Sequence, residues 1–190
     1  EEYKEGLKRT ENMTEKEKTL EMVIKNFMAK AEEMASSKNE MVMVNARQGH
    51  WAAVEVARWG AAQETIDWAV REYLKKSEHR FFGHDDFKLA IAMTLQGASD
   101  KAAEEVLAVA VKYYSWIWAV EQLTAYLRRQ PGEEEIFGIV RAEVAHTALL
   151  SEDYHKKLVE FAQKYLPVGK VRQISKMLDE KTREFNSHSN

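Results

Sequence analysis

Three residues in the last third of the chain have types and spacings that could perform chemistry. Glu143 and His146 are three positions apart, so a helix would place a carboxylate and an imidazole on one face. Helical bundles hold pairs of metal ions with such side chains, but they need a second pair and further inward-facing carboxylates. The Glu143–His146 spacing therefore does not by itself specify a metal site.

Arg141 lies five positions before His146. An arginine can bind a phosphate oxygen and a histidine can give or take a proton. The Arg141–His146 pair resembles the R-x4–6-H motif of the helical HEPN ribonucleases. The resemblance implies that both side chains would act on an RNA phosphate, in a site formed across two chains. That family commonly has a polar residue after the arginine, whereas this chain has Ala142. RNA cleavage is therefore kept as the alternative function.

A second cluster of polar side chains occupies residues 77–86, which are expected to form a loop. Its potential metal ligands are Glu78, His79, His84, Asp85 and Asp86. Imidazoles and carboxylates could bind Zn²⁺, but this spacing matches no standard helical site. Asp85 or Asp86 is also expected to cap the next helix. Glycine-rich nucleotide motifs and the G-x-S-x-G hydrolase motif are absent, so we predict neither a metal nor a cofactor.

The elements that position these residues are predicted to be helices. Mainly apolar residues recur at positions i, i+3, i+4, i+7 and i+8 in four stretches, which lines one face of a helix. The four stretches begin at Leu20, Ile66, Leu107 and Leu158. Each interval leaves room for one more helix and two turns. No run of alternating β-branched residues indicates a strand.

Turn and capping residues give the expected boundaries. Thr14 and Glu17 form a capping box, and Gly60 and Pro131-Gly132 separate helices. The expected helices cover about 14–36, 39–59 with a weak point near Gly49, 61–76, a stretch from Asp85 or Asp86 to Gly97, 100–130 with a bend near Ser115, a helix after Gly132, 152–166 and 168–185. We expect a single helical domain over 14–185, with flexible tails at 1–13 and 186–190.

Composition excludes several functional classes. The chain has 190 residues, a net charge of −3 and no cysteine. The absence of cysteine excludes disulfides and thiolate chemistry and fits a cytoplasmic protein. The charge does not favour a general nucleic-acid or membrane-surface binder. The most apolar stretch, residues 106–120, contains Lys112 and falls short of the ~20 residues of a membrane span. No signal peptide is visible near the start.

Four segments are expected to close one helix and open the next. They are Gln48-Gly49-His50-Trp51, Gln96-Gly97-Ala98-Ser99, Gln130-Pro131-Gly132 and Leu150-Ser151-Glu152-Asp153-Tyr154. Over about residues 40–185 this pattern resembles the tight turns of tetratricopeptide-type or HEAT-type helical repeats. The resemblance implies an all-α fold of about eight antiparallel helices in stacked helical hairpins. A short α-solenoid and a non-repetitive helical bundle remain alternatives.

The favoured function is that of a non-enzymatic adaptor, scaffold or complex subunit that binds a protein or peptide. Repeat families of this kind line their concave side with the first helix of each hairpin. Five cations are expected on these first helices and are candidates for binding carboxylates of an acidic segment. They are Arg47, Lys88, Arg128, Arg129 and Arg141. The aromatic run from Tyr113 to Trp118 is expected to be core, and the oligomeric state is left open.

Overall fold

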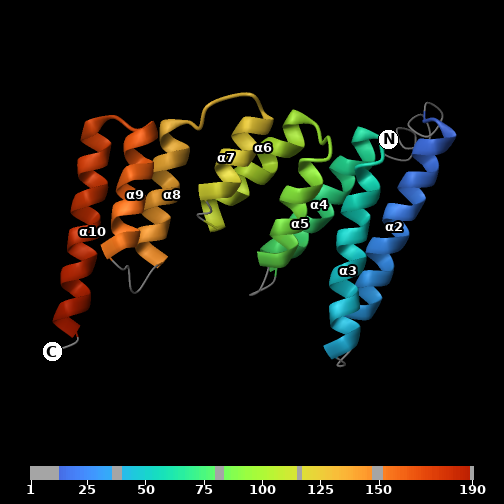
Figure 1. Ribbon diagram of the computed structural model, residues 1–190, viewed down its shortest axis with the longest axis horizontal. Coiled ribbons are helices and arrows are strands. Elements are labelled where there is room, and N and C mark those ends of the chain that lie inside the picture. Colours follow the sequence, from blue (N-terminus) through green and yellow to red (C-terminus); the bar gives the residue numbers. More distant parts are fainter. Residues whose placement is uncertain (1–12, 36–39, 80–83, 115–116, 147–151, 189–190) are drawn as a thin grey trace. The chain divides into compact units, whose positions relative to one another are not determined.

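The computed structural model describes residues 13–35, 40–79, 84–114, 117–146 and 152–188. These residues form nine α-helices and one π-helical segment, without a strand, which confirms the all-α prediction (Figure 1). The elements are α2 (Glu15–Ala35), α3 (Glu40–Ala57), α4 (Gln63–His79), α5 (His84–Thr94), α6 (Asp100–Val109), η1 (Ala110–Tyr114), α7 (Ile117–Tyr126), α8 (Glu133–His146), α9 (Glu152–Tyr165) and α10 (Val168–His188). The chain divides into two compact units, residues 1–106 and 107–190.

The start of α2 has the predicted capping box. The Thr14 amide donates to Glu17 Oε2 at 2.7 Å, and the Glu17 amide donates to Thr14 Oγ1 at 3.2 Å. Two amides that the helix itself leaves without acceptors are satisfied in this way. The buried face of α2 then follows the predicted stripe through Leu20, Ile24 and Met28.

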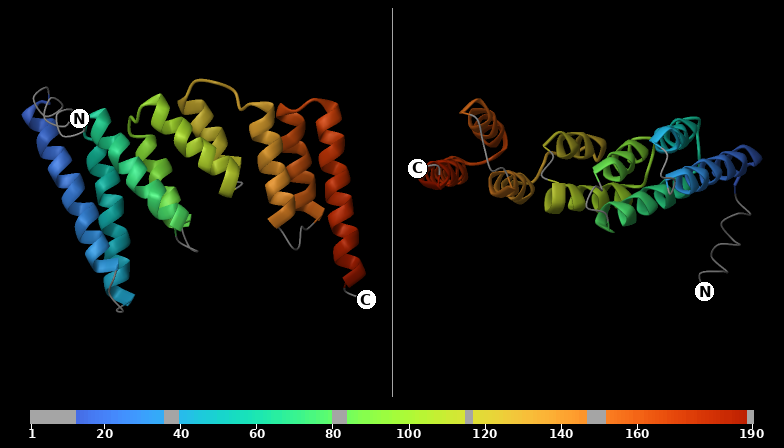
Figure 2. Two further views of the ribbon diagram at one scale, coloured as in Figure 1. Left: turned by 180° about the vertical axis from the view of Figure 1, so that it is seen from behind. Right: turned by 90° about the horizontal axis from the view of Figure 1, so that it is seen from below.

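In the first unit, α2 and α3 form a helical hairpin and lie side by side (Figures 1 and 2). The sequence interpretation placed a turn at residues 48–51, and this is wrong, because α3 continues through Gly49. A Cβ on Gly49 would lie 3.2 Å from the Cβ of Ala31 and 3.7 Å from the carbonyl oxygen of Phe27. Gly49 is therefore a point of close contact between α2 and α3, not a break in α3.

The second hairpin consists of α4 and α5. Gly60, with a φ of +99°, closes the connection that precedes α4. The predicted loop began at Ser77, but Ser77 is a buried helical residue whose hydroxyl donates to the Leu74 carbonyl. Likewise α5 begins at His84, so Asp85 and Asp86 lie in its first turn and do not precede it. Residues 80–83 lie outside the described part of the chain.

The turn between α5 and α6 follows the prediction closely. Gly97 has a φ of +120°, a conformation that favours glycine. Ser99 caps α6 by accepting a hydrogen bond from the Ala102 amide at 3.2 Å. Asp67 of α4 in turn accepts bonds from the Ser99 amide and hydroxyl at 2.7 and 2.6 Å. This polar contact connects α4 to the start of α6.

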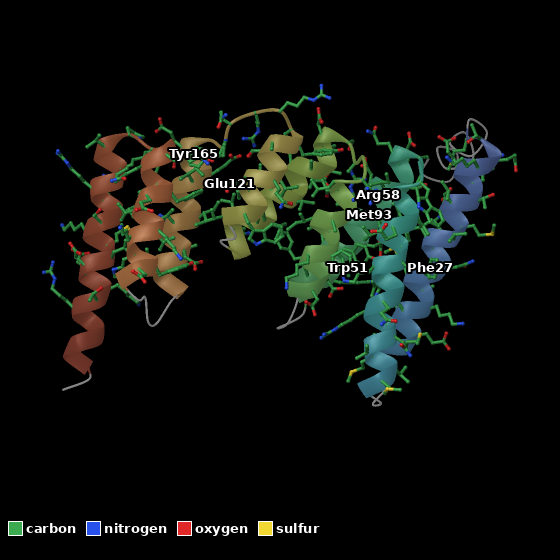
Figure 3. The ribbon with its side chains drawn as sticks, in the orientation of Figure 1. Phe27, Trp51, Arg58, Met93, Glu121 and Tyr165 are labelled. Carbon is green, nitrogen blue, oxygen red and sulfur yellow. The ribbon has the colours of Figure 1, made fainter. Side chains whose placement is uncertain are left out.

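In the second unit, α8 packs against the π-helical segment η1. A Cβ on Gly138 would lie 3.4 Å from Val111 Cγ1, at the near limit of ordinary van der Waals contact. The Tyr165 hydroxyl donates to Glu121 at 2.7 Å and links α9 to α7 (Figure 3). That bond, followed by the one from Lys164, lowers the pKa of Glu121.

Two details of the second unit differ from the sequence interpretation. Gly169 lies inside α10, which continues to His188, past the predicted end at 185. Trp118 is 42% exposed, although the aromatic run was expected to be core. The side chains of residues 113–116 lie outside the described set. The turn at Pro131-Gly132 is as predicted, with three glutamates in the first turn of α8.

We expect Gly49→Leu to lower the free energy of unfolding by about 2 kcal/mol, because the added side chain would force α2 and α3 apart. The matched control is Gly169→Leu, since nothing lies within 4 Å of a Cβ at that helical glycine. The control should leave stability unchanged or raise it slightly. Urea unfolding followed by circular dichroism measures both. Equal effects of the two substitutions would contradict the proposed close contact.

Candidate functional site

A pocket of about 700 Å³ opens in the first unit, between α3 and α5. Its polar and aromatic lining comes from Arg47, His50 and Trp51 of α3 and from Asp85, Asp86 and Lys88 of α5. Met43, Ala46 and Leu89 add apolar walls. Pockets that combine apolar walls with a few charged groups are the usual place for a ligand or partner side chain.

A buried polar network lies behind the pocket wall. His50 Nδ1 lies 3.2 Å from the hydroxyl of Tyr73, and His50 Nε2 lies 3.5 Å from a Glu32 oxygen. Lys76 donates to the same Glu32 oxygen at 2.5 Å. Burial, and then the charges of Asp86 and Glu32, raises the pKa of Tyr73 far above its ordinary value. The phenol therefore stays neutral and acts as a structural link between α3 and α4.

The rim of the pocket carries two of the five predicted cations. Arg47 Nη2 lies 3.4 Å from one oxygen of Asp85, and Lys88 Nζ lies 3.8 Å from the other. Both distances exceed those of normal hydrogen bonds. The side chains of Arg47 and Asp85 are 74% and 58% exposed, so water screens their attraction. Both cations lie on the second helix of their hairpins, whereas the sequence interpretation placed them on the first.

The other three cations belong to the second unit. Arg128 and Arg129 were expected on a helix, but they lie in the turn after α7, and Arg128 has a φ of 54°. Arg129 binds both oxygens of Glu135, at 2.6 and 2.9 Å, and Glu135 also accepts the Gly132 amide at 2.7 Å. Arg129 therefore closes the turn between α7 and α8. Its guanidinium is the main reason that the pKa of Glu135 is lowered.

Arg141 is exposed on α8, five residues before the helix ends at His146. The side chain of His146, the last residue of α8, lies outside the described set, so its distance from Arg141 is not defined. Glu143 accepts a hydrogen bond from the Tyr154 hydroxyl of α9. Burial and this bond raise the pKa of Tyr154 to about 12.

The sequence contains the Glu143–His146 spacing a second time, as Glu152 and His155 at the start of α9. His155 lines a recess between α9 and α10 together with Asp153 and Asp179. Of these two pairs, only Glu143 and His155 have described side chains. Among described residues, no group of three or more histidines and carboxylates could hold a metal ion.

Sequence reasoning missed the pocket because it placed Gln48–Trp51 in a turn. The signal that could have found it is the four-residue spacing of Met43, Arg47 and Trp51, which lines one side of a continuous helix. Asp86 was considered only as a cap or metal ligand. In the structure it is buried in the pocket, close enough to influence Tyr73.

We expect Glu135→Gln to lower the free energy of unfolding by about 1 kcal/mol at pH 7, because the Arg129 ion pair is lost. The hydrogen bonds from Arg129 lower the folded-state pKa of Glu135 below its ordinary value, so the carboxylate stabilises the fold at pH values above that ordinary pKa. This contribution is lost as the pH falls through the folded-state value. Urea titrations at several pH values should therefore show the difference from the parent protein shrinking on acidification. A difference that is independent of pH would contradict this role.

Comparison with known proteins gives no match. No protein-family model, no curated protein and no solved structure matches the chain. No helix in the described residues is both long and apolar enough to cross a membrane.

Proposed function

We propose that this chain is a non-enzymatic protein-binding or peptide-binding module and that the pocket between α3 and α5 is its binding site. The observation that carries this proposal is the lining of the pocket. It combines a 48% exposed indole, Trp51, with the guanidinium of Arg47 one helical turn away. Tryptophan and arginine are the residues that most often dominate the free energy of protein interfaces.

The weak ion pair between Arg47 and Asp85 at the rim of the pocket leaves Arg47 available to bind a carboxylate of a partner. The Arg47–Asp85 pair is long and exposed, and such pairs contribute about 0–1 kcal/mol. A carboxylate brought by a partner can therefore displace Asp85 at little cost. Asp85 would still have Lys88 one turn further along α5. Arginine suits this exchange because its planar group binds carboxylates through two hydrogen bonds.

The proposed architecture is an irregular helical repeat of the tetratricopeptide or HEAT type, in which antiparallel hairpins stack into a short α-solenoid. Its support is that α2–α3 and α4–α5 are hairpins and that α3 packs against α5. The pocket lies at that contact between consecutive hairpins. We propose that the module acts as an adaptor, scaffold or complex subunit in the cytoplasm, where proteins are rarely stabilised by disulfides, which this cysteine-free chain cannot form.

The test is capture of partners from the native cells by the tagged chain, quantified by mass spectrometry. Arg47→Glu combined with Lys88→Glu should lower the recovery of a specific partner by about tenfold or more, because it reverses the charge of the rim. The matched control is Lys30→Glu with Lys101→Glu. These exposed lysines of the first unit do not line the pocket, and the change in net charge is the same.

Partners recovered equally by both double variants would contradict the proposal. A third variant, Arg128→Glu with Arg141→Glu, tests whether the cations of the second unit also bind. Co-purified RNA that depends on Arg141 and His146 would instead favour the alternative, a HEPN-like ribonuclease.

A further inference from the structure

We infer that the partner of this surface is a second copy of the chain, with the two α3 helices packed antiparallel around a two-fold axis at Trp51. The inference rests on the proposed function, because it takes the same face of α3 as the binding surface and names what occupies it.

The face consists of Val44, Arg47, Trp51 and Glu55, which are spaced by three, four and four residues. At about 100° per residue these four lie within about 80° of one another around the helix. All four are exposed, with Val44 at 50% and Trp51 at 48%. Residues on the opposite side of α3, such as Ala46, Ala53 and Ala57, are buried. Val44 and Trp51, with the charged Arg47 and Glu55 beside them, are thus left at the surface of α3, where Figure 3 labels Trp51.

The charges on this face are complementary to those on the same face of a second, antiparallel copy. Arg47 precedes Trp51 by four residues and Glu55 follows it by four. In an antiparallel pair that is symmetric about Trp51, Arg47 of one copy therefore faces Glu55 of the other. The two-fold symmetry repeats this contact on the other side of the axis. The two indoles meet at the centre and the ion pairs flank them, which is the usual order of an apolar core and a polar rim.

Contacts within one chain do not compete strongly with this arrangement. Glu55 makes no ion pair or hydrogen bond through its side chain in the described part of the chain. Arg47 has the exposed contact with Asp85 at 3.4 Å, and Asp85 retains Lys88 when Arg47 turns away. A closer pair between Arg47 and Glu55 would also lie partly shielded from water by the indoles, which strengthens it.

The contact is small. One helix of 18 residues is about 27 Å long and offers only part of its surface. An interface of this size belongs to the weak and reversible class. The expected species is therefore a dimer that dissociates on dilution, not a permanent one.

Sedimentation velocity of the full chain over a series of concentrations tests the inference. The parent protein should change from monomer to dimer as its concentration rises. Arg47→Glu alone and Glu55→Arg alone should each weaken the dimer by about tenfold or more, since each places like charges opposite one another twice. The double variant R47E/E55R restores opposite charges at the same places and should recover most of the parent affinity.

The matched controls are Lys30→Glu and Glu64→Arg, which make the same charge changes at exposed positions away from this face. They should leave the dimer unchanged. Circular dichroism of each variant checks that it is folded. A parent protein that stays monomeric at every soluble concentration would overturn the inference. So would a dimer that neither single substitution weakens, or that the double variant fails to restore.

These results separate the inference from the proposed function. A monomeric protein whose foreign partner is lost with R47E/K88E would overturn the dimer and leave the binding function standing. A dimer that each single substitution weakens and that R47E/E55R restores, with no other protein recovered in the capture experiment, would establish self-association as the use of this surface.

Discussion

The contact between α2 and α3 at Gly49 determines the geometry on which the candidate site depends. Because a glycine faces Ala31 there, the two helix backbones approach closely. His50, the next residue, is thereby held at hydrogen-bonding distance from Tyr73 and near Glu32. Trp51 is the next residue of α3, about 100° further around the helix, and its side chain is exposed. The close packing of α3 against α2 thus determines which side chains are exposed on the opposite side of α3.

The pocket also depends on the difference in length between neighbouring helices. α3 has 18 residues and α5 has 11. The first turn of α5 lies level with Arg47, as the Asp85 contact shows, so α5 covers only part of α3. Met43, one turn before Arg47 on the same side of α3, is accordingly 42% exposed. Methionine is flexible and polarisable, and it adapts readily to the shape of a partner.

Caps and turns that depend on neighbouring residues could be predicted from the sequence. Features that depend on contacts between helices could not. The Thr14–Glu17 box, the turn at Gly97 and the Pro131-Gly132 turn each depend on neighbours within four residues, and all three were predicted. Gly49 and Ser77 were misassigned because packing against another helix, not local propensity, keeps them helical. The pocket required knowing that α3 lies against α5. Arg47 and Lys88 were each identified from the sequence as candidate binding residues. Their common contact with Asp85 was not predicted.

The turn between α7 and α8 makes part of the fold responsive to dissolved salt. Arg128 adopts a left-handed backbone conformation, which costs a residue with a side chain about 1 kcal/mol. The ion pair between Arg129 and Glu135 holds that conformation, and about a third of the arginine side chain reaches solvent. Added electrolyte shortens the range of such an attraction. The turn between α7 and α8 should therefore become less ordered as the ionic strength rises, whereas the apolar packing of the helices on either side should not change.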